Sequence, residues 1–126
     1  GVMESCEKAG MGEVVWSPLA QGLLSGKYSG GVIPKDSRAA HDKMGSFMRD
    51  SVADKTLLAK VDKFKVYAES LGVSASQLAL AWCLRKPNIT SAITSASRPE
   101  QVIENCAAAE IEFTPEFDKK IQEIFA

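Results

Sequence analysis

The sequence lacks several features that would assign it to a specialised class of protein. Its three cysteines, Cys6, Cys83 and Cys106, lie far apart and form no C-x-x-C pair, which argues against a disulfide framework and against a cysteine-based metal site. No apolar run approaches the roughly 20 residues of a membrane span, and the first residues contain no signal-peptide core. We therefore expect reduced thiols, no metal site, no membrane insertion and a cytoplasmic protein.

An excess of charge of one sign is also missing. Lys and Arg number 15 against 16 Asp and Glu, so the formal net charge is −1 and no nucleic-acid partner is indicated. The chain is 45% hydrophobic and 25% charged, which is typical of a soluble globular protein. Its 126 residues suit one domain with a modest core.

Two short apolar stretches predict strands. Val14–Trp16 is an apolar run that Ser17 and Pro18 end, and residues 89–94 (ITSAIT) are rich in β-branched side chains. Helical patterns separate the two stretches, so the strands should be parallel and joined by helices. Two strands make no sheet that could bury both of its faces, so this architecture resembles part of something larger.

Apolar periodicity and start signals predict the helices, and residues 21–50, which show little periodicity, are predicted to be a long loop. The first expected helix covers residues 2–9 and is ended by Gly10 and Gly12. Three further helices are expected to begin at capping boxes: from Ser51–Asp54 to Gly72, from Ser74–Gln77 to Pro87 (largely buried), and from Ser97–Glu100 to about Ala108. The last helix is expected to begin at Thr114, Pro115 and Glu116, and its apolar side chains are Phe117, Ile121, Ile124 and Phe125.

Polar side chains follow the second predicted strand. Ser97 and Arg98 stand at a helix N-terminus, where backbone N–H groups and a guanidinium would favour a phosphate. Gln101, Glu104 and Asn105 fall on adjacent helical positions and could hydrogen-bond an adenine edge. Alternatively, Ser97 is only a helix cap and Arg98 only a surface charge.

The first predicted strand ends in the stretch VVWSPLAQGLLSGKY. Trp16 could form an aromatic floor for a ligand, or it could simply pack in the core. The loop after it carries glycines and a single cation, Lys27, so it could wrap a phosphate; strands also end in turns for no functional reason.

Three stretches resemble the C-terminal part of an aldo-keto reductase: VVWSPLAQGLLSGKY followed by DSRA, then SASQLALAWCLRKPN, and then ITSASRPEQVIEN. The similarity is closest to the branch containing the voltage-gated potassium channel β subunits and extends over essentially the whole chain. It implies an α/β fold in which residues 1–126 are a single partial domain, the C-terminal portion of a (β/α)8 TIM barrel with strands seven and eight, their helices and a C-terminal helix. It also implies NADP(H) as cofactor and reduction of a small carbonyl substrate by hydride transfer.

The resemblance further implies which residues contact the cofactor. After the first strand, the resemblance implies that Trp16 stacks on the nicotinamide, that Lys27 contacts a phosphate, and that the ribose and pyrophosphate are lined by Ser17, Pro18, Leu19, Ala20 and Gln21. Ser37 and Arg38 would lie in a loop over the cofactor. After the second strand, Ser97 and Arg98 would hold the 2′-phosphate and favour NADP over NAD, and Gln101, Glu104 and Asn105 would lie on the adenine side. Relatives commonly have glycine where this chain has Ser95, whose side chain could crowd the cofactor.

The family's catalytic aspartate, tyrosine, lysine and histidine match no position here, because the resemblance places them on strands upstream of residue 1. Lys27 and His41 are not expected to replace them, and His41 lies in a polar segment, AAHDKM. Three interpretations stay open: an enzyme part that is active when an N-terminal barrel half completes it, a channel-β-like module that senses the cofactor, and an inactive fragment that self-associates.

Overall fold

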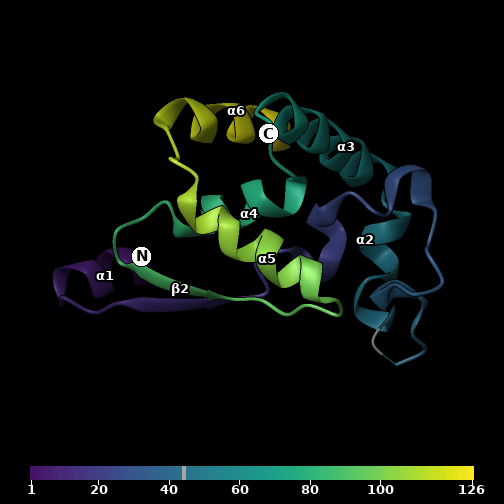
Figure 1. Ribbon diagram of the computed structural model, residues 1–126, viewed down its shortest axis with the longest axis horizontal. Coiled ribbons are helices and arrows are strands. Elements are labelled where there is room, and N and C mark those ends of the chain that lie inside the picture. Colours follow the sequence, from purple (N-terminus) through teal and green to yellow (C-terminus); the bar gives the residue numbers. More distant parts are fainter. Residues whose placement is uncertain (44) are drawn as a thin grey trace.

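The computed structural model describes residues 1–43 and 45–126. Two strands, β1 (Glu13–Trp16) and β2 (Ile89–Ile93), form a parallel sheet in which Val14 pairs with Ser91 and Trp16 with Ile93. This confirms both predicted strands and their direction. In Figure 1 the sheet lies at the bottom, α4 (Ala75–Leu84) and α5 (Pro99–Ala107) lie above it, and α3 (Lys55–Ser70) and α6 (Pro115–Phe125) form the next layer.

The two faces of the sheet have different surroundings. Val15 and Ala92 are partly buried on the face toward the helices, and α4 contacts β2. On the other face, Val14, Trp16 and Ile93 are 60%, 77% and 59% exposed. Because side chains alternate along a strand, this pattern means that helices cover one face and leave an apolar face in solvent.

The main core lies between α3, α4 and α6. Phe64 and Ala68 of α3 pack with Leu78 of α4 and Ile121 of α6, and the rings of Phe64 and Phe125 lie 5.7 Å apart. Ser74 caps α4 as predicted, because its Oγ accepts a hydrogen bond from the Gln77 N–H at 3.2 Å while the Gln77 Oε1 accepts one from the Ser74 N–H at 2.9 Å. The predicted α6 is also confirmed, with Thr114 Oγ1 accepting from the Phe117 N–H.

The segment between β1 and α3 is more ordered than the predicted long loop. It contains short 3₁₀ turns at Ala20–Ser25, Ser29–Gly31, Arg38–Ala40 and Gly45–Phe47 and a short helix, α2 (Arg49–Ala53). Tyr28 and Met48 are almost fully buried against Leu58 and Val61 of α3. The segment therefore has its own small core, which sequence periodicity does not reveal. Met44, within the predicted loop, lies outside the described residues.

Two predicted capping boxes are wrong. Asp54 rather than Ser51 caps α3, since the Asp54 Oδ1 accepts hydrogen bonds from the N–H groups of Thr56 and Leu57 at 2.9 and 3.0 Å. At α5 the side chain that completes the capping box belongs to Gln101 rather than to Glu100. Its Oε1 accepts from the N–H groups of Ser97 and Arg98, which makes Arg98 the N-cap residue. The cap of α3 therefore lies three residues later, and the capping box of α5 one residue later, than the sequence predicted.

The remaining expectations for the fold concern the termini and the thiols. Helix α1 (Val2–Lys8) is present and is followed by Gly10 at a φ of +66°. Cys6, Cys83 and Cys106 are free thiols, and burial raises the pKa of the Cys83 thiol. None of the helices in the described part of the chain is long and apolar enough to cross a membrane.

Candidate functional site

A groove of about 450 Å³ opens at the carboxyl ends of the two parallel strands. This is where open α/β sheets generally bind their ligands. Its lining comes from the end of β1 and the turn after it (Trp16, Ser17, Pro18, Leu19, Gln21, Gly22, Ser25 and Lys27), from the following loop (Asp36 and Arg38), from the first turn of α4 (Ser76), and from the end of β2 with α5 (Ile93, Thr94, Ser95, Ser97, Gln101, Glu104 and Asn105).

The turn after β1 has an unusual backbone. Ser17, Ala20 and Gln21 have φ angles of 56°, 47° and 61°, a region that residues other than glycine seldom occupy. Gln21 holds the turn together, because its Nε2 donates to the Ser17 Oγ at 2.9 Å and its Oε1 accepts from the Arg38 guanidinium. This link joins the end of β1 to the loop that contains Arg38. Such strained backbone is concentrated at functional sites.

Lys27 lies along this turn because Gly22 has no side chain. Gly22 has a φ of +99°, and a Cβ added there would lie 3.1 Å from the Lys27 Cε. The Lys27 ammonium stands 5.7 Å from the centroid of the Tyr28 ring, whose own position is fixed by burial. A glycine at position 22 thus lets a lysine side chain reach the groove beside the backbone.

The other wall of the groove is the first half of α5. Gln101 is held by its hydrogen bonds to the backbone N–H groups of Ser97 and Arg98. Glu104 accepts a hydrogen bond from the Ser74 hydroxyl through its Oε1. The groove therefore carries two cations, Lys27 and Arg38, near the β1 turn, and carboxamide and carboxylate groups along α5.

Most residues that the family resemblance assigned to the cofactor line this groove: Trp16, Ser17, Pro18, Leu19, Gln21, Lys27, Arg38, Ser95, Ser97, Gln101, Glu104 and Asn105. Three assigned residues are not among its lining. Ala20 is exposed, Arg98 is exposed at the start of α5, and Ser37 is buried. Within the described residues, the Ser37 Oγ has no hydrogen-bond partner. Contacts of these three residues with a cofactor stay predictions.

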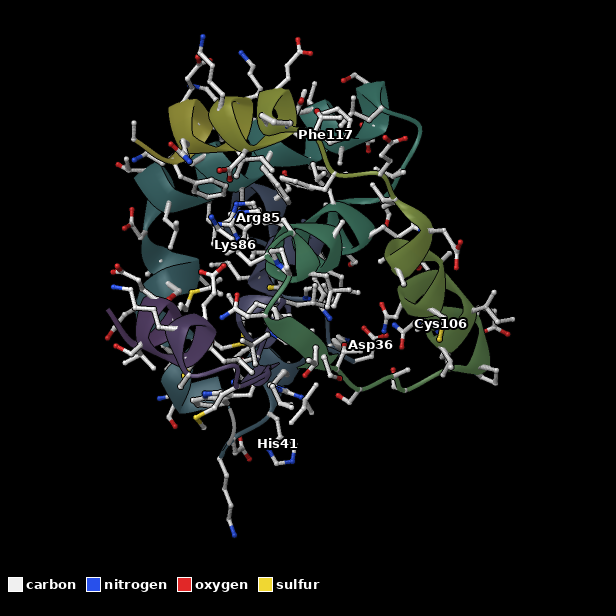
Figure 2. All side chains as sticks on the ribbon, turned by 90° about the vertical axis from the view of Figure 1, so that its left-hand side faces the viewer. Asp36, His41, Arg85, Lys86, Cys106 and Phe117 are labelled. Atoms are coloured by element: carbon white, nitrogen blue, oxygen red, sulfur yellow. The ribbon has the colours of Figure 1, made fainter. Side chains whose placement is uncertain are left out.

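Other residues of the lining were missed by sequence reasoning. They are Gly22, Ser25, Asp36, Ser76, Ile93 and Thr94. Asp36 adjoins Ser37 in the DSRA motif, and Ser76 follows the Ser74 cap, so both stood next to a recognised signal. Asp36 is exposed and lines the groove, whereas His41, which is also exposed, lies at the edge of the molecule in Figure 2. In residues 1–43 and 45–126, no cluster of histidine, cysteine and acidic side chains has the arrangement of a metal site.

Comparison with known proteins gives one family and several relatives. The model of the Aldo/keto reductase family matches residues 1–126. The chain is 44% identical, over 117 residues, to a probable voltage-gated potassium channel subunit beta of Oryza sativa subsp. japonica, which covers 91% of this chain and 35% of that protein. The corresponding Arabidopsis thaliana protein is 45% identical over 102 residues, or 81% and 31% of the two chains.

A putative voltage-gated potassium channel subunit beta of Schizosaccharomyces pombe is 43% identical over 118 residues, which make up 91% of this chain and 34% of that protein. The chain thus spans roughly a third of the length of the curated relatives that it matches.

Proposed function

This chain belongs to the aldo/keto reductase family, and from that premise we propose that residues 1–126 are a partial domain that supplies much of the NADPH site of a carbonyl reductase. The observation that carries this proposal is the groove. It lies at the carboxyl ends of two adjacent parallel strands, and it gathers most of the residues that the family resemblance assigns to NADP(H). NADP(H) is also the cofactor that the family generally uses.

We infer that the two strands are strands seven and eight of a (β/α)8 barrel. The bare face of the sheet supports this, because Val14, Trp16 and Ile93 would point into a barrel, whose interior is filled by side chains from all of its strands. Without the other strands of the barrel, this apolar face would have to pack against another protein surface. An N-terminal barrel half is the proposed partner, and residues 1–126 alone are proposed to self-associate.

The residues present fit the chemistry of NADPH. The indole of Trp16 offers a flat apolar surface for the nicotinamide, and Lys27 and Arg38 offer positive charge for the pyrophosphate. Ser97, Arg98 and the N-terminus of α5 would hold the 2′-phosphate. When bound, NADPH supplies the hydride that reduces a carbonyl. The residues of this chain bind and orient the cofactor, and we assign none of them as the acid that protonates the product.

A second candidate function is favoured by the names of the relatives, which are those of channel β subunits. In that case the groove would report cofactor occupancy to a membrane channel, and turnover would be secondary. Copurification of the natural protein with a channel would favour this function. An inactive fragment that self-associates is the third interpretation.

Replacing Trp16 with alanine tests the proposed groove. We expect NADPH and NADH to lose affinity by the same factor, about 2- to 13-fold, because the nicotinamide ring is common to both cofactors and an aromatic contact is worth about 0.5–1.5 kcal/mol beyond its area. Calorimetric titration of the natural protein measures both affinities. Trp82→Phe is the matched control, because Trp82 lies on α4 outside the lining of the groove. Unchanged affinities in the Trp16 variant would place the cofactor elsewhere.

A further inference from the structure

Glu104 is held from two sides by the first turn of α4. The Ser74 hydroxyl donates a hydrogen bond to the Glu104 Oε1, and the Gln77 Nε2 donates one to the Glu104 backbone oxygen at 3.2 Å. One bond therefore fixes the carboxylate and the other fixes the backbone of the same residue. Residues 74 and 77 are also the capping box of α4, so helix α4 begins at the point where it contacts α5.

Capping alone does not require this arrangement. An N-cap side chain needs only to accept a hydrogen bond from the start of its helix, and the Ser74 Oγ does so from the Gln77 N–H at 3.2 Å. The hydroxyl has one proton, and that proton goes to Glu104. An aspartate would cap α4 equally well but could not donate to a carboxylate.

The consequence concerns the second oxygen of Glu104. An ionised carboxylate only accepts hydrogen bonds, and Ser74 occupies the Oε1. The side chain is partly buried and lines the groove beside Gln101 and Asn105. Ser74 uses one of the roughly four lone-pair sites of this carboxylate, so the Oε2 can accept a hydrogen bond from a ligand in the groove. A donor at this wall would be favoured, and an acceptor in the same place would be repelled.

We propose that Ser74 and Gln77 are positioning residues that orient Glu104 so that the groove selects a 6-amino purine over a 6-oxo purine. This rests on the proposed function, in which the α5 side of the groove receives the base of the dinucleotide. The amino group of adenine donates to the carboxylate, whereas the carbonyl oxygen of hypoxanthine faces it as a second acceptor. Selection then depends on α4 as well as on α5.

The test compares NADPH with its deaminated analogue, which carries hypoxanthine, in the natural full-length chain that contains this sequence. Because a hydrogen bond to a charged group is worth about 1.5–3 kcal/mol, the unaltered protein is expected to prefer NADPH by about 10- to 150-fold. Ser74→Asp keeps the cap but replaces the donor with a second carboxylate that repels Glu104 from its position, and its preference should fall to about threefold or less. Ser74→Thr keeps both the cap and the donor, and should retain the preference.

A double substitution shows whether Ser74 acts through Glu104. Glu104→Gln should lower the preference by itself, and adding Ser74→Asp should lower it no further. If Ser74→Asp weakens both cofactors equally and keeps the preference, the contact is merely structural and the inference is overturned while the proposed function stands. If the unaltered protein binds both cofactors without preference, the inference is likewise overturned. If it binds neither, the inference and the proposed function both fail.

Discussion

Residues 1–126 produced alone are expected to oxidise NADPH with an aldehyde about 10²- to 10⁴-fold more slowly than a protein in which the proposed barrel is complete. We assign none of these residues as the acid that protonates the product, and general acid catalysis is worth that factor. The groove offers no obvious replacement. Lys27 follows β1, where we place the pyrophosphate, and Asp36 lies in the next loop. Glu104 is engaged by the Ser74 hydroxyl, and His41 lies at the edge of the molecule. The measurement is the loss of NADPH absorbance with both proteins at equal concentration. Turnover by pure residues 1–126 at the full-length rate would contradict the account.

The same preparation is expected to self-associate, which sedimentation can measure. Trp16, at 77% exposed, is the largest side chain on the bare face of the sheet, and exposed apolar patches of this kind mark contact surfaces. Trp16→Ser should weaken the association. Val66→Ser is the matched control, since Val66 is 65% exposed but stands on α3, away from the sheet. A compact monomer at micromolar concentration would contradict this prediction, because the exposed apolar face of the sheet would then be stable in water without self-association.

Replacing Arg98 with alanine is expected to weaken NADPH binding to the natural protein by about 10- to 150-fold and to leave NADH binding nearly unchanged. The 2′-phosphate of NADPH carries close to two negative charges and is absent from NADH. The Ser97 hydroxyl and the N–H groups of Ser97 and Arg98 donate to the Gln101 Oε1, so they would have to exchange that partner for the phosphate, and they could not neutralise its charge. A guanidinium adds a charge-assisted contact worth about 1.5–3 kcal/mol. Arg98→Lys should recover only part of the affinity, because an ammonium has no bidentate geometry.

The position of Arg98 makes this prediction informative. The residue is the exposed N-cap of α5 and is not part of the groove lining, although the adjacent Ser97 is. Its side chain would have to turn toward the phosphate on binding. Lys86→Ala is the control, because Lys86 is an exposed cation just before β2, at the opposite end of the strand. Equal losses for NADPH and NADH in the Arg98 variant would mean that the 2′-phosphate lies elsewhere.

The parts of the fold that follow from neighbouring residues were predictable. The strands, the start of α4 at Ser74 and the start of α6 at Thr114 all depend on signals within a few residues, and the structure has them. The start of α3 was mispredicted because Ser51 and Asp54 are both good caps, and the sequence does not show which one adopts the extended backbone of an N-cap. The order in the segment 21–50 depends on burial of Tyr28 and Met48 against α3, a contact between distant residues.

The candidate site shows the same division. Trp16 was found because it ends β1 and Ser97 because it comes shortly after β2, and the ends of parallel strands meet at one edge of a sheet. Asp36 and Ser76 were missed, since their presence at the groove depends on how a loop and a helix start are folded beside it. The link between Ser74 and Glu104 spans 30 residues of sequence, and no local pattern indicates it.

Hydrogen exchange of the natural protein with and without NADPH tests the central claim most directly, because it locates the bound cofactor on the chain. The account predicts that NADPH slows amide exchange in two separate segments, residues 16–27 after β1 and residues 94–105 from the end of β2 into α5, while α6 exchanges as before. Slowed exchange in only one of these segments, or in neither, would contradict the claim that both strand ends form one NADPH site.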